Sequence, residues 1–203
     1  MHPTTDVILA SGSPRRRSIL GAAGIAFEVM VPAIDDARFA PDARDPRRFV
    51  MCLAWFKARQ VAADAERRWG TGGPRWVVAA DTMCVHGGQV LGKPADDRDA
   101  LAMLRGFRDR SHDVVTGLCV LDRSCGARTI VADSARVALG SLADAELESY
   151  ASGGAWRGKA GGYNFADRVE AGWPLSCDGD PETVMGLPSR ILLPLLRGEA
   201  ASR

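Results

Sequence analysis

Three consecutive arginines near the start of the chain stand where a helix is expected to begin. The apolar run 7–10 is typical of a buried strand, and Ser13-Pro14 is typical of an N-cap and first helical residue. Arg15, Arg16 and Arg17 then occupy the first helical turn, at a cost of roughly 0.3–1 kcal/mol each against the helix dipole when no anion is present. A solvated basic turn is the alternative, but the flanking strand and helix favour a phosphate-binding site.

A single carboxylate, Asp81, is the strongest catalytic candidate. It directly follows the apolar run 76–80, which predicts a strand that ends at Asp81 and Thr82. The end of such a strand is where α/β folds place their ligand crevices. The alternative is an aspartate that caps a helix or turn.

Three lysines and an acidic pair complete the set of candidates. Lys93 follows a predicted hairpin back from Asp81, and the two are expected to face one cleft. Lys57 lies in an apolar part of a predicted helix, where snorkelling to solvent is the alternative. Lys159 is surrounded by glycines, which permit close approach to a phosphate oxygen, and Asp36, next to Asp35, could supply a second carboxylate to a hard cation. Cations, carboxylates and glycines together suit a nucleotide polyphosphate.

The elements that must position these residues alternate between helical and strand patterns, which predicts an α/β fold with a mixed sheet. Helices are expected over 14–23, 46–68, 96–107, 141–150 (opened by a capping box of Ser141 and Asp144) and after Pro188. Strands are expected over 7–10, 27–31, 76–80, 114–121, 129–139 and once more before the last helix, with a hairpin joining 83–85 to 89–91.

Composition limits the classes of function. The 203 residues suit one α/β domain, and a net charge of +1 gives no global attraction to nucleic acid or membrane. No signal peptide or membrane-spanning run is seen, and five scattered cysteines are typical of core thiols in a reducing cytosol, so a cytoplasmic location is expected. The P-loop, the nucleophile elbow and the zinc helix are absent. His112 is interpreted as a strand residue that is structural or contacts a ligand.

In the order and spacing of its motifs, the chain resembles the Maf family of nucleoside triphosphate pyrophosphatases. The motifs are Leu9-Ala10-Ser11-Gly12-Ser13-Pro14-Arg15-Arg16, Lys57-Ala58, Ala80-Asp81-Thr82, Leu91-Gly92-Lys93-Pro94, Thr116-Gly117, Lys159-Ala160-Gly161-Gly162-Tyr163 and Val184-Met185-Gly186-Leu187-Pro188. The resemblance implies a Maf/inosine triphosphatase-like fold: an elongated mixed sheet flanked by helices, with a cleft between two lobes of one domain over residues 1–203. It also implies a homodimer and a reaction that yields a nucleoside monophosphate and pyrophosphate.

The resemblance also implies roles for individual residues. Phosphates would be bound by Ser11, Arg15, Arg16, Lys57 and Lys93, with Lys159 as a further contact. Asp81 matches the catalytic proton acceptor and would also lie near a divalent metal, Mg²⁺ or Mn²⁺, with Asp36 as the second metal residue. Arg15, Thr82 and Ala166 match positions linked to substrate choice.

Two segments depart from the family pattern. Where the pyrimidine-preferring branch has Ile-Gln-Gly, this chain has Phe165-Ala166-Asp167, and an alanine cannot hydrogen-bond a base. Asn164 and Asp167 are the candidates to take over recognition. The segment 172–183 is longer than usual and lacks the asparagine common before Val184.

The sequence therefore predicts a metal-dependent nucleoside triphosphate pyrophosphatase that clears ordinary or modified nucleotides from the pool. The alternative is a nucleotide-binding regulator without turnover, for instance one of cell division. Nucleic-acid binding through the arginine cluster is disfavoured, because the chain lacks a broad basic face with interleaved aromatic residues.

Overall fold

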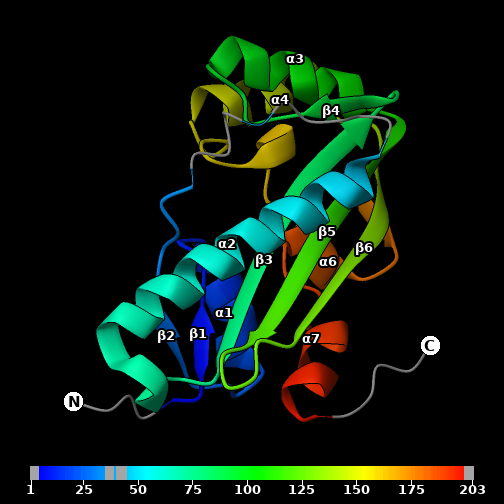
Figure 1. Ribbon diagram of the computed structural model, residues 1–203. Coiled ribbons are helices and arrows are strands. Elements are labelled where there is room, and N and C mark those ends of the chain that lie inside the picture. The colour runs from blue at the N-terminus through cyan, green and yellow to red at the C-terminus, as the bar shows by residue number, and fades with distance from the viewer. Residues whose placement is uncertain (1–4, 35–38, 40–44, 199–203) are drawn as a thin grey trace.

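The computed structural model describes residues 5–34, 39 and 45–198. In this part of the chain seven strands form one open mixed sheet in the order β2-β1-β3-β5-β6-β7, with β4 paired to the end of β3 (Figure 1). Only the pairs of β1 with β2 and β3 are parallel. The strands are β1 (Val7–Leu9), β2 (Phe27–Val29), β3 (Trp76–His86), β4 (Gln89–Leu91), β5 (Arg110–Asp122), β6 (Arg128–Leu139) and β7 (Leu175–Asp178).

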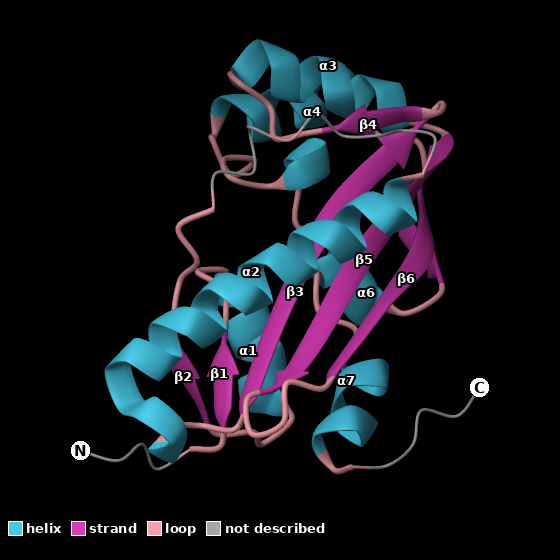
Figure 2. Cartoon of the chain, viewed as in Figure 1, coloured by secondary structure: helices cyan, strands magenta, loops and turns pink. Residues whose placement is uncertain are grey.

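Helices cover both faces of the sheet and one of its ends. Figure 2 shows the long helix α2 crossing one face of β3, β5 and β6, while α3 and α4 lie together at the far end beside β4. The helices are α1 (Pro14–Ala22), α2 (Pro46–Trp69), α3 (Asp97–Phe107), α4 (Asp144–Ser152), α5 (Phe165–Glu170), α6 (Pro181–Met185) and α7 (Ser189–Leu196), with 3₁₀ turns η2 (Gly70–Gly72) and η3 (Ala160–Gly162).

The long strand β3 belongs to two hydrophobic clusters, because alternate strand residues lie on opposite faces of a sheet. Val77 and Ala79 pack in the cluster that contains the buried face of α2. The two residues that alternate with them pack with side chains of α1 and α7. Continued along the strand, this alternation places Asp81 on the α2 face and Thr82 on the opposite face.

One edge of β3 is divided between two neighbours. β1 pairs with β3 in parallel as far as Val78, and β4 pairs with it in antiparallel fashion from Cys84 onward. Between these two points no strand of the described residues pairs with this edge of β3. The gap separates a lobe containing β1, β2 and α1 from a lobe containing β4, α3 and α4 (Figure 1).

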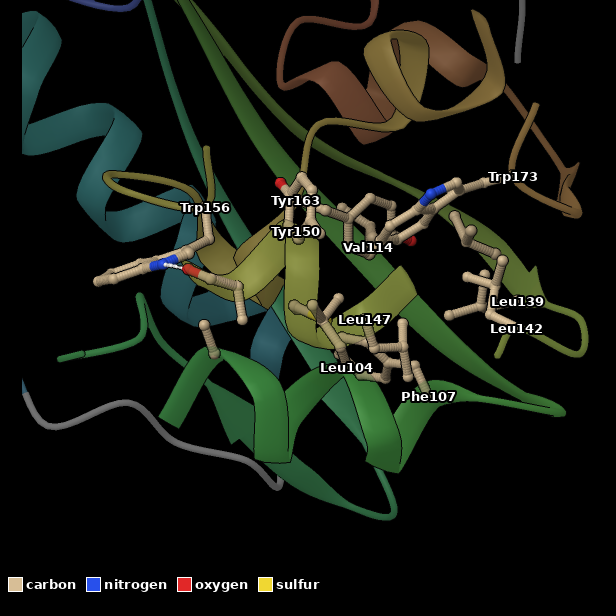
Figure 3. Packing of buried hydrophobic residues seen from close by; sticks show 14 residues of the cluster. Leu104, Phe107, Val114, Leu139, Leu142, Leu147, Tyr150, Trp156, Tyr163 and Trp173 are labelled. Atoms are coloured by element: carbon tan, nitrogen blue, oxygen red, sulfur yellow. Dashed lines mark hydrogen bonds between the residues drawn. The ribbon is translucent and has the colours of Figure 1, made fainter. Parts of the chain in front are cut away.

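The second lobe has its own buried cluster, in which aromatic side chains are prominent (Figure 3). Leu104 and Phe107 of α3 and Leu147 of α4 pack there with residues of β5 and β6. Tyr163 and Trp173 belong to the same cluster. The segment that follows η3 is therefore anchored by its tyrosine, which fixes its position beside the gap in the β3 edge.

The α/β class, the mixed sheet and the elongated shape predicted from the sequence are confirmed. Two local predictions are wrong. β3 does not end at Asp81 but continues to His86, because its backbone pairs with β5 whatever the polarity of its side chains. Ser141 does not open α4, since the N-cap is Ala143 and no side chain caps this helix.

Candidate active site

A cavity of about 770 Å³ opens at the divided edge of β3. It is lined by the turn between β1 and α1, the segment after β2, Lys57 of α2, the centre of β3, and the segment 157–165 of the second lobe. Among the described residues of this lining, six are lysine or arginine and only Asp81 is acidic. The cavity is therefore strongly cationic with one carboxylate inside it.

Arg16 connects three parts of the cavity wall. Its Nε donates to the Gly186 carbonyl at 2.8 Å, one terminal nitrogen donates to Ser11 Oγ at 3.2 Å, and the other donates to Thr82 Oγ1 at 3.1 Å. Ser11 is buried and also accepts from the Ser13 amide. These contacts fix the guanidinium of Arg16 at the N-terminal turn of α1. Arg17, by contrast, is exposed and is not a lining residue, although its guanidinium donates to the carbonyl of Gly12.

Asp81 is paired with a buried lysine. Lys57 Nζ lies 2.6 Å from Asp81 Oδ1, and the two side chains are 9% and 12% exposed. Lys57 therefore does not snorkel to solvent. The pair forms because Asp81 lies on the α2 face of β3, where a close approach of α2 is allowed by Gly117, the residue opposite Asp81 in β5.

Further cations lie where the two lobes face each other, with Arg15 from α1 and Lys159 from the second lobe. Burial is the main cause that lowers the pKa of Arg15 and of Lys159, and the nearby charge of Arg15 lowers that of Lys159 further. The Nε of Arg15 is buried and has no hydrogen-bond partner among the described residues. Two adjacent, partly desolvated cations favour a bound anion between them. Lys93 and Arg157 line the same cavity.

The segment after η3 contributes polar and aromatic groups. Asn164 Oδ1 is buried without a hydrogen-bond partner in the described structure, although Asn164 is the N-cap of α5. Tyr163 bonds through its hydroxyl to His112 Nε2 at 2.8 Å, and Phe165 lines the cavity beside them. Burial lowers the pKa of His112 to about 4, so the imidazole is neutral at pH 7.

The structure places most of the predicted site residues in this one cavity. Those that line it are Ser11, Arg15, Arg16, Lys57, Asp81, Thr82, Lys93 and Lys159. Ala166 is exposed on α5 and is not in the lining, and neither is Asp167. Asp36 lies outside the described residues. Sequence reasoning missed Arg157, although the neighbouring Gly158 was an available signal. It also missed the contact of Arg16 with Gly186, for which the sequence has no local signal.

A mixed α/β sheet with a divided edge, and a cationic cavity that holds one buried carboxylate, define the class of this protein. The chain belongs to the Maf-like protein family, whose model matches residues 6–199.

Curated relatives are similar over nearly their whole length. A dTTP/UTP pyrophosphatase of Salinibacter ruber is 38% identical over 96% of this chain and 91% of its own. Proteins of the same name from Pelotomaculum thermopropionicum and Deinococcus radiodurans are 35% and 38% identical, over 95% and 97% of this chain and 95% and 94% of theirs. No helix in the described part of the chain has the length and hydrophobicity required to cross a membrane.

Proposed function

We propose that the chain is a nucleoside triphosphate pyrophosphatase, which hydrolyses a nucleotide to its monophosphate and pyrophosphate. The observation that carries the proposal is the buried Asp81 carboxylate in a cavity whose other charged lining residues, within the described structure, are all cations. Cations bind phosphate oxygens, and a carboxylate among them can accept a proton from water. The names of the similar proteins support the same reaction.

In the proposed reaction, water attacks the α-phosphorus in line with the bond to the bridging oxygen. Asp81 orients this water and accepts its proton as the new oxygen–phosphorus bond forms. The bond between the α-phosphorus and the bridging oxygen breaks, and pyrophosphate leaves with the electron pair. Lys57 holds the Asp81 carboxylate through the 2.6 Å contact, so the proton acceptor is fixed before substrate arrives.

The cations of the cavity would bind the phosphate chain and stabilise the charge that develops on the leaving group. Ser11 and Arg16 come from the first lobe and Lys57 from α2, whereas Lys93 and Lys159 come from the second lobe. Because the two groups come from different lobes, an extended triphosphate can contact both at once.

The site also fits a divalent cation that substrate carries in. No cluster of three potential metal-binding side chains occurs among the described residues. Mg²⁺ typically keeps several waters and binds one or two carboxylates together with substrate phosphates, which suits a site with Asp81 alone. We propose Mg²⁺ or Mn²⁺, with Asp81 as its protein ligand and Asp36 as a candidate for a second. When bound, the ion would neutralise phosphate charge as a Lewis acid.

For the base, uracil and thymine are the first candidates, because the relatives are named dTTP/UTP pyrophosphatases. Asn164 is proposed to contact the base, since its buried Oδ1 needs a hydrogen-bond donor and lies in the cavity lining. The N3–H of uracil or thymine is such a donor. Removal of modified nucleotides from the pool is a further part of the proposal.

The proposal extends to the location of the protein and to its assembly. All five cysteines are free, and Cys84 and Cys119 are buried thiols, as expected in a reducing cytoplasm. A homodimer is expected from the resemblance stated above. Light scattering coupled to size-exclusion chromatography would measure the mass directly.

The decisive experiment measures pyrophosphate release from a panel of ordinary and modified nucleoside triphosphates, with Mg²⁺ or Mn²⁺, by the wild type and Asp81→Asn. Metal-dependent release that falls at least 100-fold in the variant is expected, since general-base catalysis contributes about 10²–10⁴. Nucleotide binding without release from any nucleotide would instead support the regulator without turnover.

A further inference from the structure

Arg16 and four other residues form a closed ring of hydrogen bonds. Thr82 Oγ1 and Thr116 Oγ1 are 2.9 Å apart, and Thr116 Oγ1 donates to the Thr183 carbonyl at 2.8 Å. That carbonyl also accepts from the Gly186 amide at 3.1 Å. Gly186 and Thr82 are in turn the acceptors of Arg16 described above. The ring thus links α1, β3, β5 and the end of α6.

The direction of every bond in this ring is determined. A carbonyl oxygen can only accept, so the single hydroxyl proton of Thr116 is committed to Thr183. Thr116 must therefore accept from Thr82, which in turn commits the hydroxyl proton of Thr82. The oxygen of Thr82 is left as an acceptor, and that is what the N–H of Arg16 requires. If Thr82 donated toward Arg16, two donors would face each other.

We infer that Thr116 is a positioning residue for phosphate binding, because it sets the orientation of the Thr82 hydroxyl and so the plane of the Arg16 guanidinium. Thr116 is fully buried and is not part of the cavity lining, so it has no contact of its own with a ligand. Arg16 is a lining residue. A guanidinium binds phosphate best in a fixed, planar geometry, so its orientation governs affinity.

The inference rests on the proposed function in that the ligand is a phosphate chain. Its test uses inorganic pyrophosphate as the probe and needs no turnover. Thr116→Val keeps the shape of the side chain and removes its hydroxyl. In Thr116→Val the Thr183 carbonyl still accepts from the Gly186 amide, so no buried carbonyl loses its last hydrogen-bond donor. Thr116→Ser restores the hydroxyl.

The chain offers a matched control in Thr183. Thr183 is as buried as Thr116. Its hydroxyl donates to Asp133 Oδ2 at 2.5 Å, away from Arg16, and only its backbone carbonyl belongs to the ring. Thr183→Val therefore removes an equally buried hydroxyl and leaves the path from Thr116 to Arg16 complete.

Calorimetric titration with pyrophosphate is expected to give a dissociation constant at least tenfold higher for Thr116→Val. Thr116→Ser and Thr183→Val should stay within about twofold of the wild type. In turnover, Thr116→Val should raise KM without changing the order of preference among bases. Equal affinities of Thr116→Val and the wild type, or equal losses in Thr116→Val and Thr183→Val, would overturn the inference. Wild-type protein that binds no pyrophosphate would overturn the proposed function as well.

Discussion

Lys57 of α2 and Asp81 of β3 form an ion pair at 2.6 Å whose two side chains are almost fully buried. The pair joins the helix that crosses one face of the sheet to the strand at the centre of the cavity. Removing two charges from water is costly, and it is repaid only by close mutual contact. Stability alone is therefore a weak explanation for this pair. Because both side chains line the cationic cavity, the pair can instead take part in the chemistry of the site.

Replacement of one member of this pair should harm stability and activity together. Lys57→Met removes the ammonium partner of a buried carboxylate, and loss of one partner of a buried pair typically costs about 3–5 kcal/mol. We expect a lower free energy of unfolding, by about 3 kcal/mol or more, and at least a tenfold lower kcat. Urea unfolding and pyrophosphate release measure the two effects.

The double variant Lys57→Met with Asp81→Asn separates these effects. It leaves no unpaired charge, so the free energy of unfolding should recover much of the loss, whereas activity should stay as low as in Asp81→Asn. A stable and active Lys57→Met would contradict the proposed role of the pair.

How much the sequence could predict depended on how local each signal is. The turn of Ser11 and Arg16 and the extent of α2 follow from neighbouring residues, and both were predicted. The strand through Asp81 was missed, because its polar side chains interrupt the apolar run while the pairing that continues it comes from β5. The contact of Arg16 with Gly186 joins residues 170 positions apart, beyond any local pattern. Ala166 was linked to substrate choice through the resemblance to a family motif. Its side chain is exposed outside the cavity because of how α5 packs, and the motif carries no information on that packing.

Gly117 should be indispensable for the approach of α2 to β5. A Cβ at this position would lie 2.4 Å from the backbone carbonyl of Val50 in α2. Because backbone atoms cannot turn aside as side chains do, Gly117→Ala must move the helix that carries Lys57. We expect a loss of several kcal/mol in the free energy of unfolding, and reduced kcat in whatever protein folds.

Gly106 of α3 provides the control for Gly117. Nothing lies within 4 Å of a Cβ built there, so Gly106→Ala should stabilise the helix by roughly 0.5–1 kcal/mol. Thermal unfolding of the two variants should shift in opposite directions. If Gly117→Ala had the same thermal stability as the wild type, the prediction that close packing of α2 on β5 requires a glycine at this position would be contradicted.

His112 should make stability depend on pH. Burial lowers its pKa from 6.5 to about 4, so the unfolded chain binds more protons than the folded chain between these values. Stability from this residue is present above pH 6.5 and is lost as the pH falls toward 4. A shift of this size corresponds to about 3 kcal/mol.

Urea unfolding of the wild type and His112→Gln across pH 4 to 8 measures this effect. The glutamine does not titrate and can still bond to Tyr163, so its profile should fall less between pH 6.5 and 4. Parallel profiles for the wild type and His112→Gln would show that His112 has no part in the pH dependence.

Recognition of the base should depend on Asn164 rather than on Asp167 or Ala166. Only Asn164 among the three lines the cavity, and its Oδ1 is buried without a partner in the described structure. With UTP, this oxygen would accept from the N3–H of uracil, and 3-methyluridine triphosphate lacks that donor. The wild type should therefore prefer UTP over its 3-methyl analogue by at least tenfold in kcat/KM.

In Asn164→Leu, the preference for UTP over the 3-methyl analogue should fall toward one, because the group that reads N3–H is gone. Affinity for inorganic pyrophosphate should be unchanged, which separates base recognition from phosphate binding. Asp167→Asn is the matched control and should retain the preference, since Asp167 is exposed outside the lining. If Asn164→Leu kept the preference and Asp167→Asn lost it, recognition would belong to the exposed aspartate, and α5 would have to turn toward the cavity when the nucleotide binds.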